Sequence, residues 1–558
     1  DYLVTVGLLM LSVTLLALLV HSIMNFFACR TAAKIARDLR TNLFDRVVSF
    51  SDTEINKFGA ASLITRGTND IQLIQNLCLM AQRMMVYTPI IAIGGIIMVT
   101  QTNVSMGWII ALAVAIVVVV MGILIGITMP KFKIMQKLID RVNLVSREIL
   151  TGLSVVRAFG KQQYEEDRFT QANTKLLKTQ LFTNRAMVLM SPILVLVMNA
   201  VAIAIVWIGA QYVDMGTTQV GDLIAFITYS MMIITSFLFL GVIAVVIPRA
   251  SVASARVDEV IETSLSIEDA IETYDETIGA GEGISISFED VCFRYEDEER
   301  SDKEDKKHRR KKDKPKPADT PLPSYVLENV SFVAPAGQTT AVIGATGSGK
   351  STVVKLIERF NEVTSGSVCI DGVDIRAISQ KRLHELIAYV PQSAFLFSGT
   401  IKSNISYGNP DADDDRLMRA LDIAQATEFV SSEEKGLDAP VSQGGTNVSG
   451  GQRQRLAIAR ALAVDAKAIL FDDSFSALDY KTDAALRHEL ASSLKGKTVI
   501  IVAQRIATIM NADNIIVLKE GKVVGSGTHE VLMQSCLEYR DIAYSQLSEE
   551  ELERGGAR

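Results

Sequence analysis

Five long apolar stretches constrain this chain more than any other feature, because about 20 apolar residues are enough for a helix to cross a lipid bilayer. The mean hydropathy of the chain is +0.26 and 49% of its residues are hydrophobic, which is rare among soluble globular proteins. A large part of the chain is therefore expected in a membrane. The stretches span residues 3–27, 84–98, 106–129, 187–208 and 223–247.

The segments between these stretches alternate in charge. Residues 28–83 and 130–186 are long and rich in lysine and arginine, whereas the turns at 101–105 and 211–219 contain neither residue. Because cytoplasmic segments of membrane proteins carry the excess of positive charge, we expect both long segments in the cytoplasm. Apolar residues recur there mostly at a spacing of three or four, which predicts helices that continue below the membrane.

A change in composition divides the chain into two domains. Residues 1–260 form the predicted membrane domain, 261–283 an acidic linker, and 284–548 a soluble domain with a pattern of short strands and helices. Within the soluble domain, residues 296–323 are so charged that we predict a disordered surface insertion. Residues 549–558 form a tail.

The charge of the chain argues against nucleic-acid binding, and its cysteine spacing argues against a zinc site. The net charge is -7 and the isoelectric point is about 5.5, so the chain has no basic field that would favour nucleic acid. The basic run 306–316 is expected to be a solvated loop, with a patch for anionic lipid or an acidic partner as the alternative. The 5 cysteines form no CxxC pair and are interpreted as reduced thiols without zinc.

The strongest motif in the soluble domain is a P-loop with the sequence GATGSGKST at residues 344–352. It follows an expected strand at 340–343 and opens a helix, which is the context that such a loop requires. Its backbone amides can wrap phosphates, its lysine can neutralise phosphate oxygens, and the next serine can ligate Mg²⁺. The chain is therefore predicted to bind ATP with Mg²⁺. The predicted ATP-binding residues here are Gly344, Thr346, Gly347, Ser348, Gly349, Lys350, Ser351 and Thr352.

A second motif lies further along the chain. The segment KAILFDD at 467–473 has the pattern of a buried strand that ends in carboxylates, as a Walker B strand does. Asp472 is placed to hold Mg²⁺ through water. Its position downstream of the P-loop makes this motif specific.

Between these two motifs, the segment VSGGQRQR at 448–455 opens another expected helix. It resembles the signature of the ABC ATPase family and differs from the common LSGGQ only by valine in place of leucine. The resemblance implies that four residues bind the γ-phosphate of ATP held on the opposite subunit, because a helix N-terminus attracts an anion. These residues are Ser449, Gly450, Gly451 and Gln452.

Three further positions resemble ABC ATPase motifs. Tyr295, in VCFRY, is similar to the aromatic residue that stacks on adenine, and Gln392, in YVPQ, is similar to the glutamine that contacts Mg²⁺. Asp479, in SALD, resembles the aspartate of the D-loop. The resemblance thus implies that Ser351, Gln392 and Asp472 are the metal ligands.

The membrane half resembles the exporter branch of the ABC family, in which both domains share one chain. GLSVVRAF at 152–159 matches its second cytoplasmic loop, and LFSGTI at 396–401 matches a pattern after the glutamine motif. The resemblance implies a membrane α-helical domain of the type I ABC exporter, or type IV ABC transporter, fold, fused to an α/β P-loop ATPase domain. Since five spans are readable, we expect the first of the family's six helices to be missing.

Two positions depart from the family pattern. Asp473 stands where a glutamate usually follows the Walker B aspartate, and Gln504 stands where a histidine usually contacts the γ-phosphate. The shorter side chain withdraws the carboxylate by about 1.5 Å, and errors of about 1 Å can cost about 100-fold in rate. Glutamine can donate a hydrogen bond but cannot become a cation. With Asp473 and Gln504 as its candidate catalytic residues, the chain thus resembles the degenerate half of bacterial heterodimeric exporters, in which one ATP site is catalytic and the other mainly holds nucleotide.

The sequence therefore predicts ATP-driven, multidrug-type export of hydrophobic or amphipathic compounds by a heterodimer with a second half-exporter chain. ATP hydrolysis is expected mainly at the site built on the partner's P-loop. The expected location is the cell membrane, with the ATP-binding domain in the cytoplasm. The spans carry no charged residue at their centres, which disfavours a strongly charged cargo. A homodimeric lipid flippase or peptide exporter, and an ATP-gated channel or regulatory membrane protein, are alternatives.

Overall fold

The structure is a computed structural model that divides into two compact units. The first contains residues 1–48 and 61–263, and the second contains residues 49–60 and 264–558. The insertion predicted at 296–323 lies outside the described residues. The described residues are 2–102, 106–271, 273–295 and 324–547.

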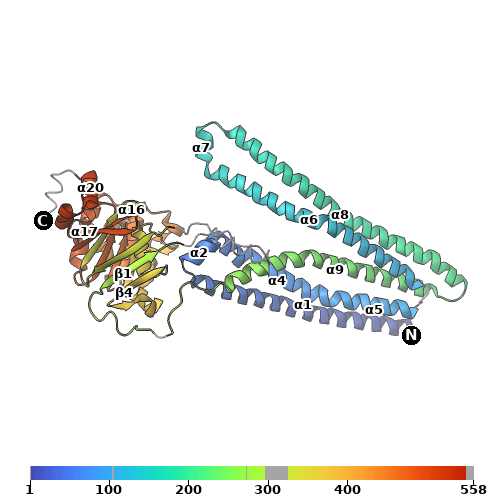
Figure 1. The fold of residues 1–558 in the computed structure, drawn as a ribbon. Helices are drawn as coiled ribbons and strands as arrows, with labels where there is room; N and C mark the ends of the chain where they lie inside the picture. The colour runs from blue at the N-terminus through green and yellow to red at the C-terminus, as the bar shows by residue number, and fades with distance from the viewer. Residues whose placement is uncertain (1, 103–105, 272, 296–323, 548–558) are drawn as a thin grey trace. The chain divides into compact units, whose positions relative to one another are not determined.

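The first unit consists of long helices (Figure 1). They are α1 (Tyr2–Val48), α3 (Ala60–Thr65), η1 (Arg66–Asp70), α4 (Ile71–Met80), η2 (Ala81–Met85), α5 (Val86–Thr102), α6 (Gly107–Thr151), α7 (Leu153–Ala158), α8 (Gln162–Asp214) and α9 (Val220–Ile261). Helices α6 and α8 lie side by side and are joined by α7, while α1, α4, α5 and α9 form a second group. Among the described residues, 5 helical stretches are long and apolar enough to cross a membrane, which confirms the predicted number of spans.

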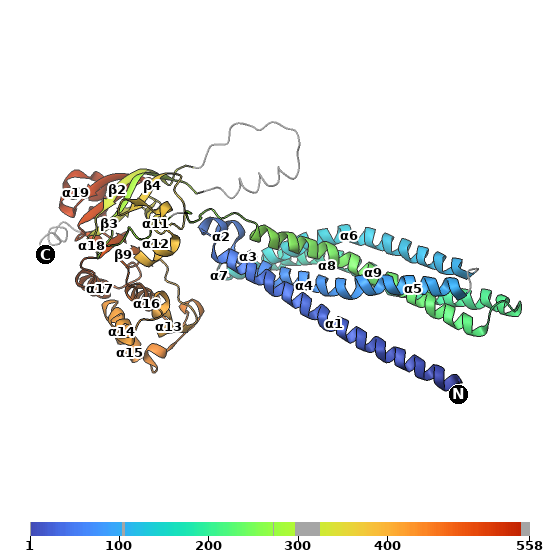
Figure 2. The ribbon, with the colours of Figure 1, turned by 90° about the horizontal axis from the view of Figure 1, so that it is seen from below.

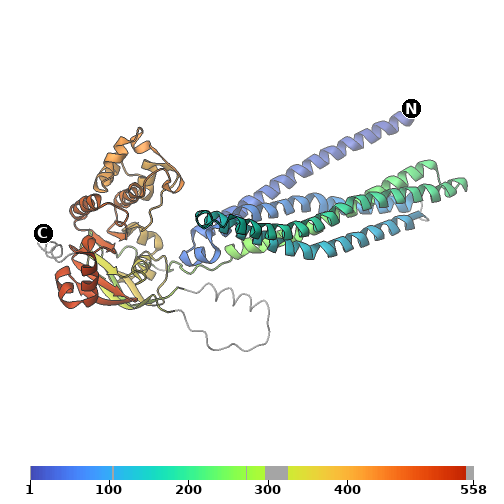
Figure 3. The same cartoon turned by 90° about the horizontal axis from the view of Figure 1, so that it is seen from above.

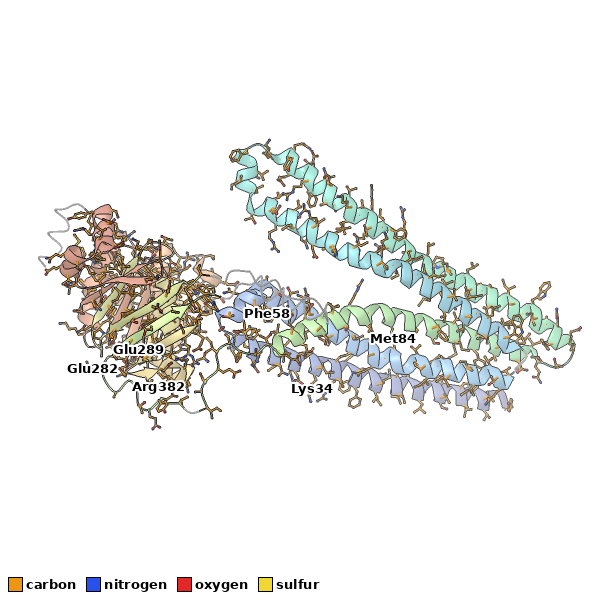
Figure 4. The ribbon with its side chains drawn as sticks, viewed as in Figure 1. Lys34, Phe58, Met84, Glu282, Glu289 and Arg382 are labelled. Atoms are coloured by element: carbon orange, nitrogen blue, oxygen red, sulfur yellow. The ribbon has the colours of Figure 1, made fainter. Side chains whose placement is uncertain are left out.

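Helix α1 shows how the helices of this unit pack. It buries Ala28, Ala32 and Ala36, which repeat every four residues, and it packs mainly against α4. Small side chains at this spacing let two helices approach closely. Lys34 lies on an exposed side of the same helix (Figure 4). Toward its N-terminal end α1 diverges from the other helices (Figure 3), and its exposed apolar side chains there suit a lipid environment.

Charged side chains join η1 to α9 in the first unit. Arg66 Nη1 lies 2.8 Å from Glu259 Oε2 and 2.6 Å from the carbonyl oxygen of Arg256. The guanidinium of Arg256 pairs with Asp70 at 3.2 Å. Since Arg66 and Asp70 are buried, each of these charges needs its partner, and the pairs fix η1 against α9.

The second unit contains an α/β domain built on two main sheets. The strands are β1 (Ile286–Phe293), β2 (Leu327–Ala334), β3 (Thr339–Gly344), β4 (Ser365–Ile370), β5 (Val373–Asp374), β6 (Ile387–Val390), β7 (Gly399–Thr400), β8 (Pro440–Val441), β9 (Ala468–Asp472), β10 (Thr498–Val502), β11 (Asn514–Lys519) and β12 (Lys522–Gly527). The larger sheet has the order β12-β11-β3-β10-β9-β6, with β12 as an antiparallel edge on parallel strands. The smaller, antiparallel sheet has the order β2-β1-β4-β5.

The register of the larger sheet positions the site. Strands β9 and β10 are buried at every position, which is typical of parallel strands covered on both faces. Val502, at the end of β10, pairs with Asp472 on one side and with Val342 on the other. The P-loop, the Walker B carboxylates and the segment after Val502 therefore meet at the carboxyl edge of one sheet.

Helices cover the sheets and form a separate group on one side of the domain. Helices α13 to α16 gather away from the smaller sheet (Figure 2). The helices of the second unit are α2 (Asp52–Phe58), α11 (Lys350–Ile357), α12 (Gln380–Leu386), α13 (Ile401–Ile405), α14 (Asp414–Ile423), α15 (Thr427–Ser432), α16 (Gly450–Leu462), α17 (Tyr480–Ser493), α18 (Ile506–Ile509), α19 (His529–Ser535) and α20 (Leu537–Gln546), with short 3-10 turns η4 (Ile375–Ala377), η5 (Ser406–Gly408), η6 (Gly436–Asp438) and η7 (Gln443–Gly445).

Helix α2 belongs to the second unit, although it lies in the sequence between helices of the first. Ser51 caps its N-terminus, and Glu54 completes the capping box. Glu54 Oε1 also accepts the N–H of Ser266 at 2.9 Å. Asp52 Oδ2 lies 2.7 Å from Lys355 Nζ on α11. The contact with Lys355 attaches α2 to the helix that follows the P-loop, and the contact with Ser266 attaches α2 to the segment after α9.

Candidate functional site

The P-loop connects β3 to α11 and forms a cradle for phosphate. Gly347 and Gly349 have φ values of +82° and +97°, a left-handed conformation that glycine adopts without strain. Lys350 Nζ donates hydrogen bonds of 2.8 Å to the carbonyl oxygens of Gly344 and Ala345, at the mouth of the loop. Ser348 Oγ is buried, and the described residues give it no hydrogen-bond partner. A buried hydroxyl and a cation at the start of a helix fit a phosphate group.

Burial decides the electrostatics of Lys350. Removal from water lowers the pKa of its ammonium group, while the carboxylates of Asp473 and Asp472 act in the opposite direction. A bound triphosphate would add negative charge beside the same ammonium. ATP binding is therefore expected to favour the charged form of Lys350.

Ser351 and Asp472 provide two oxygens that fit a magnesium ion. The Ser351 hydroxyl donates a 2.9 Å hydrogen bond to Asp472 Oδ1 at the end of β9. Burial raises the pKa of Asp472, and the hydrogen bond from Ser351 opposes that shift. Within the described ranges, no group of three His, Cys, Asp or Glu side chains could hold a metal alone. The Ser351 and Asp472 oxygens suit Mg²⁺, which usually combines one or two protein ligands with substrate phosphates and water.

The predicted catalytic residue Gln504 and the predicted metal ligand Gln392 both donate to one oxygen atom of Asp473, the other predicted catalytic residue. Asp473 Oδ2 accepts a 3.1 Å hydrogen bond from Gln392 Nε2 and a 2.9 Å hydrogen bond from Gln504 Nε2. Asp473 has a φ of +47°, and its N–H donates to the carbonyl oxygen of Val502 at 2.9 Å. Burial raises the pKa of Asp473, while the hydrogen bond from Gln392 opposes that shift. The carboxylate is thus held between two amide groups.

Tyr295 lies beside the P-loop helix, as an adenine-stacking residue requires. Its hydroxyl is 3.3 Å from Thr352 Oγ1 on α11, and its ring meets Phe293 edge to face with centroids 4.8 Å apart. The side chain is 42% exposed. A substantial part of the residue is therefore open to a ligand.

The signature segment forms the exposed N-terminus of α16. Ser449 Oγ accepts the N–H of Gln452 at 3.2 Å, and Gln452 Oε1 accepts the N–H of Ser449 at 2.9 Å. A Cβ added at Gly450 would meet no atom within 4 Å, so open space lies before this glycine. Among the described residues, no hydrogen bond joins Ser449–Gln452 to the P-loop.

The D-loop aspartate has a local structural role in this fold. Asp479 is the N-cap of α17, and its carboxylate accepts the N–H of Thr482 at 3.1 Å. Hydrogen bonds to Thr482 lower the pKa of this exposed carboxyl group. The residue stabilises the start of α17 just after the Walker B region.

Two residues near the site were missed from the sequence. Lys355 lies one turn after Ser351 on α11 and pairs with Asp52, and its position four residues after Ser351 was the available signal. Gln546, at the end of α20, bonds to the backbone around Gln504. No motif marks Gln546, because only the tertiary fold brings α20 to this segment.

Comparisons with known proteins agree with this geometry. The family description "ABC transporter transmembrane region" matches residues 1–237, and "ABC transporter" matches residues 327–476. An uncharacterized ABC transporter ATP-binding protein of Mycobacterium tuberculosis is 39% identical over 546 residues, which are 97% of this chain and 89% of that protein. An ATP-dependent lipid A-core flippase of Desulfotalea psychrophila is 29% identical over 521 residues, covering 92% of this chain and 84% of that protein.

A solved structure of a bacterial Atm1-family ABC exporter with ATP bound has the same fold. Its TM-score is 0.74 at 24% sequence identity, and the match covers 93% of this chain and 86% of that one. The fold is thus that of an exporter with an N-terminal membrane domain and a C-terminal ATPase domain, as the sequence predicted. This chain belongs to the ABC transporter family. Within that family it is a multi-pass membrane transporter with an ABC ATPase domain on the same chain, and its fold is that of an exporter.

Proposed function

We propose that this chain is one subunit of a heterodimeric exporter of hydrophobic or amphipathic compounds in the cell membrane, of the multidrug efflux type. In this proposal its own ATP site mainly holds nucleotide. The signature segment, residues 449–452, completes the hydrolytic site on the partner's P-loop. The observation that carries the proposal is the pair of hydrogen bonds from Gln392 and Gln504 to Asp473 Oδ2.

Those hydrogen bonds bear directly on hydrolysis. A general base needs a free lone pair within reach of the attacking water, and geometry decides before the pKa does. Burial raises the pKa of Asp473, which alone would make it a stronger base. Its Oδ2 already accepts two amide donors, however, which leaves Oδ1 as the oxygen for water, and its side chain is about 1.5 Å shorter than that of glutamate. Gln504 also cannot supply a positive charge to the γ-phosphate.

The nucleotide-binding half of the same site supports retention of ATP. Lys350, the buried Ser348 hydroxyl and the P-loop amides fit the phosphates, and the Ser351–Asp472 pair fits Mg²⁺. When bound there, Mg²⁺ would neutralise phosphate charge. This site is therefore suited to binding ATP, while the two altered positions slow its hydrolysis.

Two short helices support transmission of ATP binding to the membrane domain. Helix α2 is tied to α11 through Asp52 and Lys355, so a movement of α11 reaches the chain between α1 and α3. No residue of α7 is buried, and Val155 is 57% exposed while the adjoining Phe159 is 72% exposed. Exposed apolar residues in α7 and at its C-terminal end suit docking onto the ATP-binding domain of the partner chain.

The proposal is tested by comparing the chain alone with the assembled pair. Purified alone, the chain should bind ATP but turn it over very slowly. A gain of hydrolysis in the isolated chain after the double change Asp473→Glu and Gln504→His would show that these two positions limit it. Robust turnover by the unaltered chain, abolished by Asp473→Asn, would contradict the proposal and favour a homodimer.

A second candidate function is homodimeric lipid flipping, and the similarity to a lipid A-core flippase favours it.

A transport experiment separates these functions. Sealed inside-out vesicles that contain both half-exporters should accumulate a fluorescent amphipathic compound against its gradient when ATP is supplied. A homodimeric flippase would instead move labelled lipid with this chain alone. An ATP-gated channel would only dissipate a gradient, so concentrative uptake excludes it.

A further inference from the structure

The end of α20 reaches into the loop that carries Gln504. Gln546 Oε1 accepts the N–H of Ile506 at 2.8 Å, and Gln546 Nε2 donates to the carbonyl oxygen of Gln504 at 2.7 Å. Both polar ends of one amide are thus used on the backbone of the same short segment. An amide side chain can form such a double contact in only one orientation.

Helix α20 provides a fixed base for this contact. Tyr539 and Ala543 are fully buried in the core that also contains Ile506 and Leu532. The Tyr539 hydroxyl lies 2.8 Å from His529 Nδ1, which ties α20 to α19. Core packing therefore holds α20 up to Ala543, and the exposed side chain of Gln546 extends from the last residue of this helix.

The loop itself has little regular structure. Residues 503–505 connect β10 to α18 outside any helix or strand. Arg487 Nη1 donates to the carbonyl oxygen of Ala507 at 2.7 Å, further along the segment. The two bonds of Gln546 lie on either side of Arg505, directly at the backbone that orients Gln504.

We propose that Gln546 is a positioning residue of the ATP site. A continuous series of hydrogen bonds runs from Gln546 to the backbone of Gln504 at 2.7 Å, and from the Gln504 side chain to Asp473 at 2.9 Å. The packing of α20 in the core thereby influences where the Gln504 side chain lies beside Asp473. The role goes beyond the proposed function, because it holds whether the site hydrolyses ATP or only retains it.

The experiment measures nucleotide binding at this site in the assembled transporter. Photo-labelling of this chain with azido-ATP, in competition with MgATP, reports its own P-loop site. Gln546→Ala should weaken MgATP competition about fivefold, since two hydrogen bonds of modest net strength are lost. Gln546→Glu should weaken it at least as much, because it places an oxygen against the Gln504 carbonyl. Ser545→Ala is the matched control, since the Ser545 hydroxyl donates to the carbonyl oxygen of Ile542 within α20.

A positioning role differs from a merely stabilising one in two measurable ways. The melting temperature of Gln546→Ala should match that of the Ser545→Ala control. The double variant Gln504→Ala with Gln546→Ala should bind no more weakly than Gln504→Ala alone, because both changes act through one contact. Additive losses, a lower melting temperature that accounts for the loss, or unchanged binding in Gln546→Ala would each overturn the proposal.

Discussion

The P-loop end of the ATP-binding domain and its signature end carry different parts of the ABC ATPase pattern. The P-loop end has the phosphate-binding residues, but Asp473 and Gln504 replace the usual glutamate and histidine beside them. The signature end has an intact serine-glycine-glycine segment before α16, with open space in front of Gly450. This difference is the basis of our proposal that the chain contributes unequally to two ATP sites.

The largest effect is expected from a change at the signature end. Gly450→Asp puts a carboxylate where the backbone must approach the partner's γ-phosphate, so like charges repel. We expect ATPase activity of the complex to fall about 100-fold or more, as when a main stabilising contact of the transition state is lost. Gly450→Ala, which fits the open space, should retain much more activity. Equal losses in both variants would point to a folding defect instead.

The next largest effect is expected at the P-loop end. Lys350→Ala removes a buried cation from the phosphate cradle, so ATP binding at this chain's own site should weaken about 10- to 100-fold. Photo-labelling of this chain with azido-ATP measures that change. Lys381→Ala, an exposed change on α12, serves as the control. Unaltered labelling of the Lys350→Ala chain would refute the phosphate-binding role.

The P-loop end also carries a buried acid that makes stability depend on pH. Glu358 follows α11, is fully removed from water, and has its pKa raised to about 8 by burial. In the unfolded chain the Glu358 carboxyl group ionises near its usual pKa of about 4.5. The free energy of unfolding therefore falls as the pH rises from about 4.5 to 8. Glu358→Gln should therefore raise the melting temperature increasingly over that range, and little at pH 5. A pH-independent difference would show that Glu358 is already ionised.

The smallest effect is expected at Asp473, the aspartate that stands where the family usually has a glutamate. In the proposed heterodimer the working base belongs to the partner, so Asp473→Asn should change ATPase activity of the complex by less than about twofold. The matched change in the partner, at its corresponding glutamate, should abolish activity. A loss of most activity in Asp473→Asn would remove the proposed difference between the two ATP sites.

Local sequence pattern determined the five spans, the P-loop and the Walker B strand. Each of these depends on residues close together in the chain: a run of apolar residues, glycines before a helix, or a buried strand ending in carboxylates. The two departures at Asp473 and Gln504 were likewise visible without a structure. The family resemblance then supplied their roles.

Only the tertiary structure decided what those side chains contact. Gln392 and Gln504 lie 81 and 31 residues from Asp473, and they reach one oxygen because β6, β9 and β10 are neighbours in a parallel sheet. The grouping of α2 with the ATP-binding domain and the reach of Gln546 from α20 also had no sequence signal. Hydrogen bonds between distant residues depend on strand register and core packing, which no short segment specifies by itself.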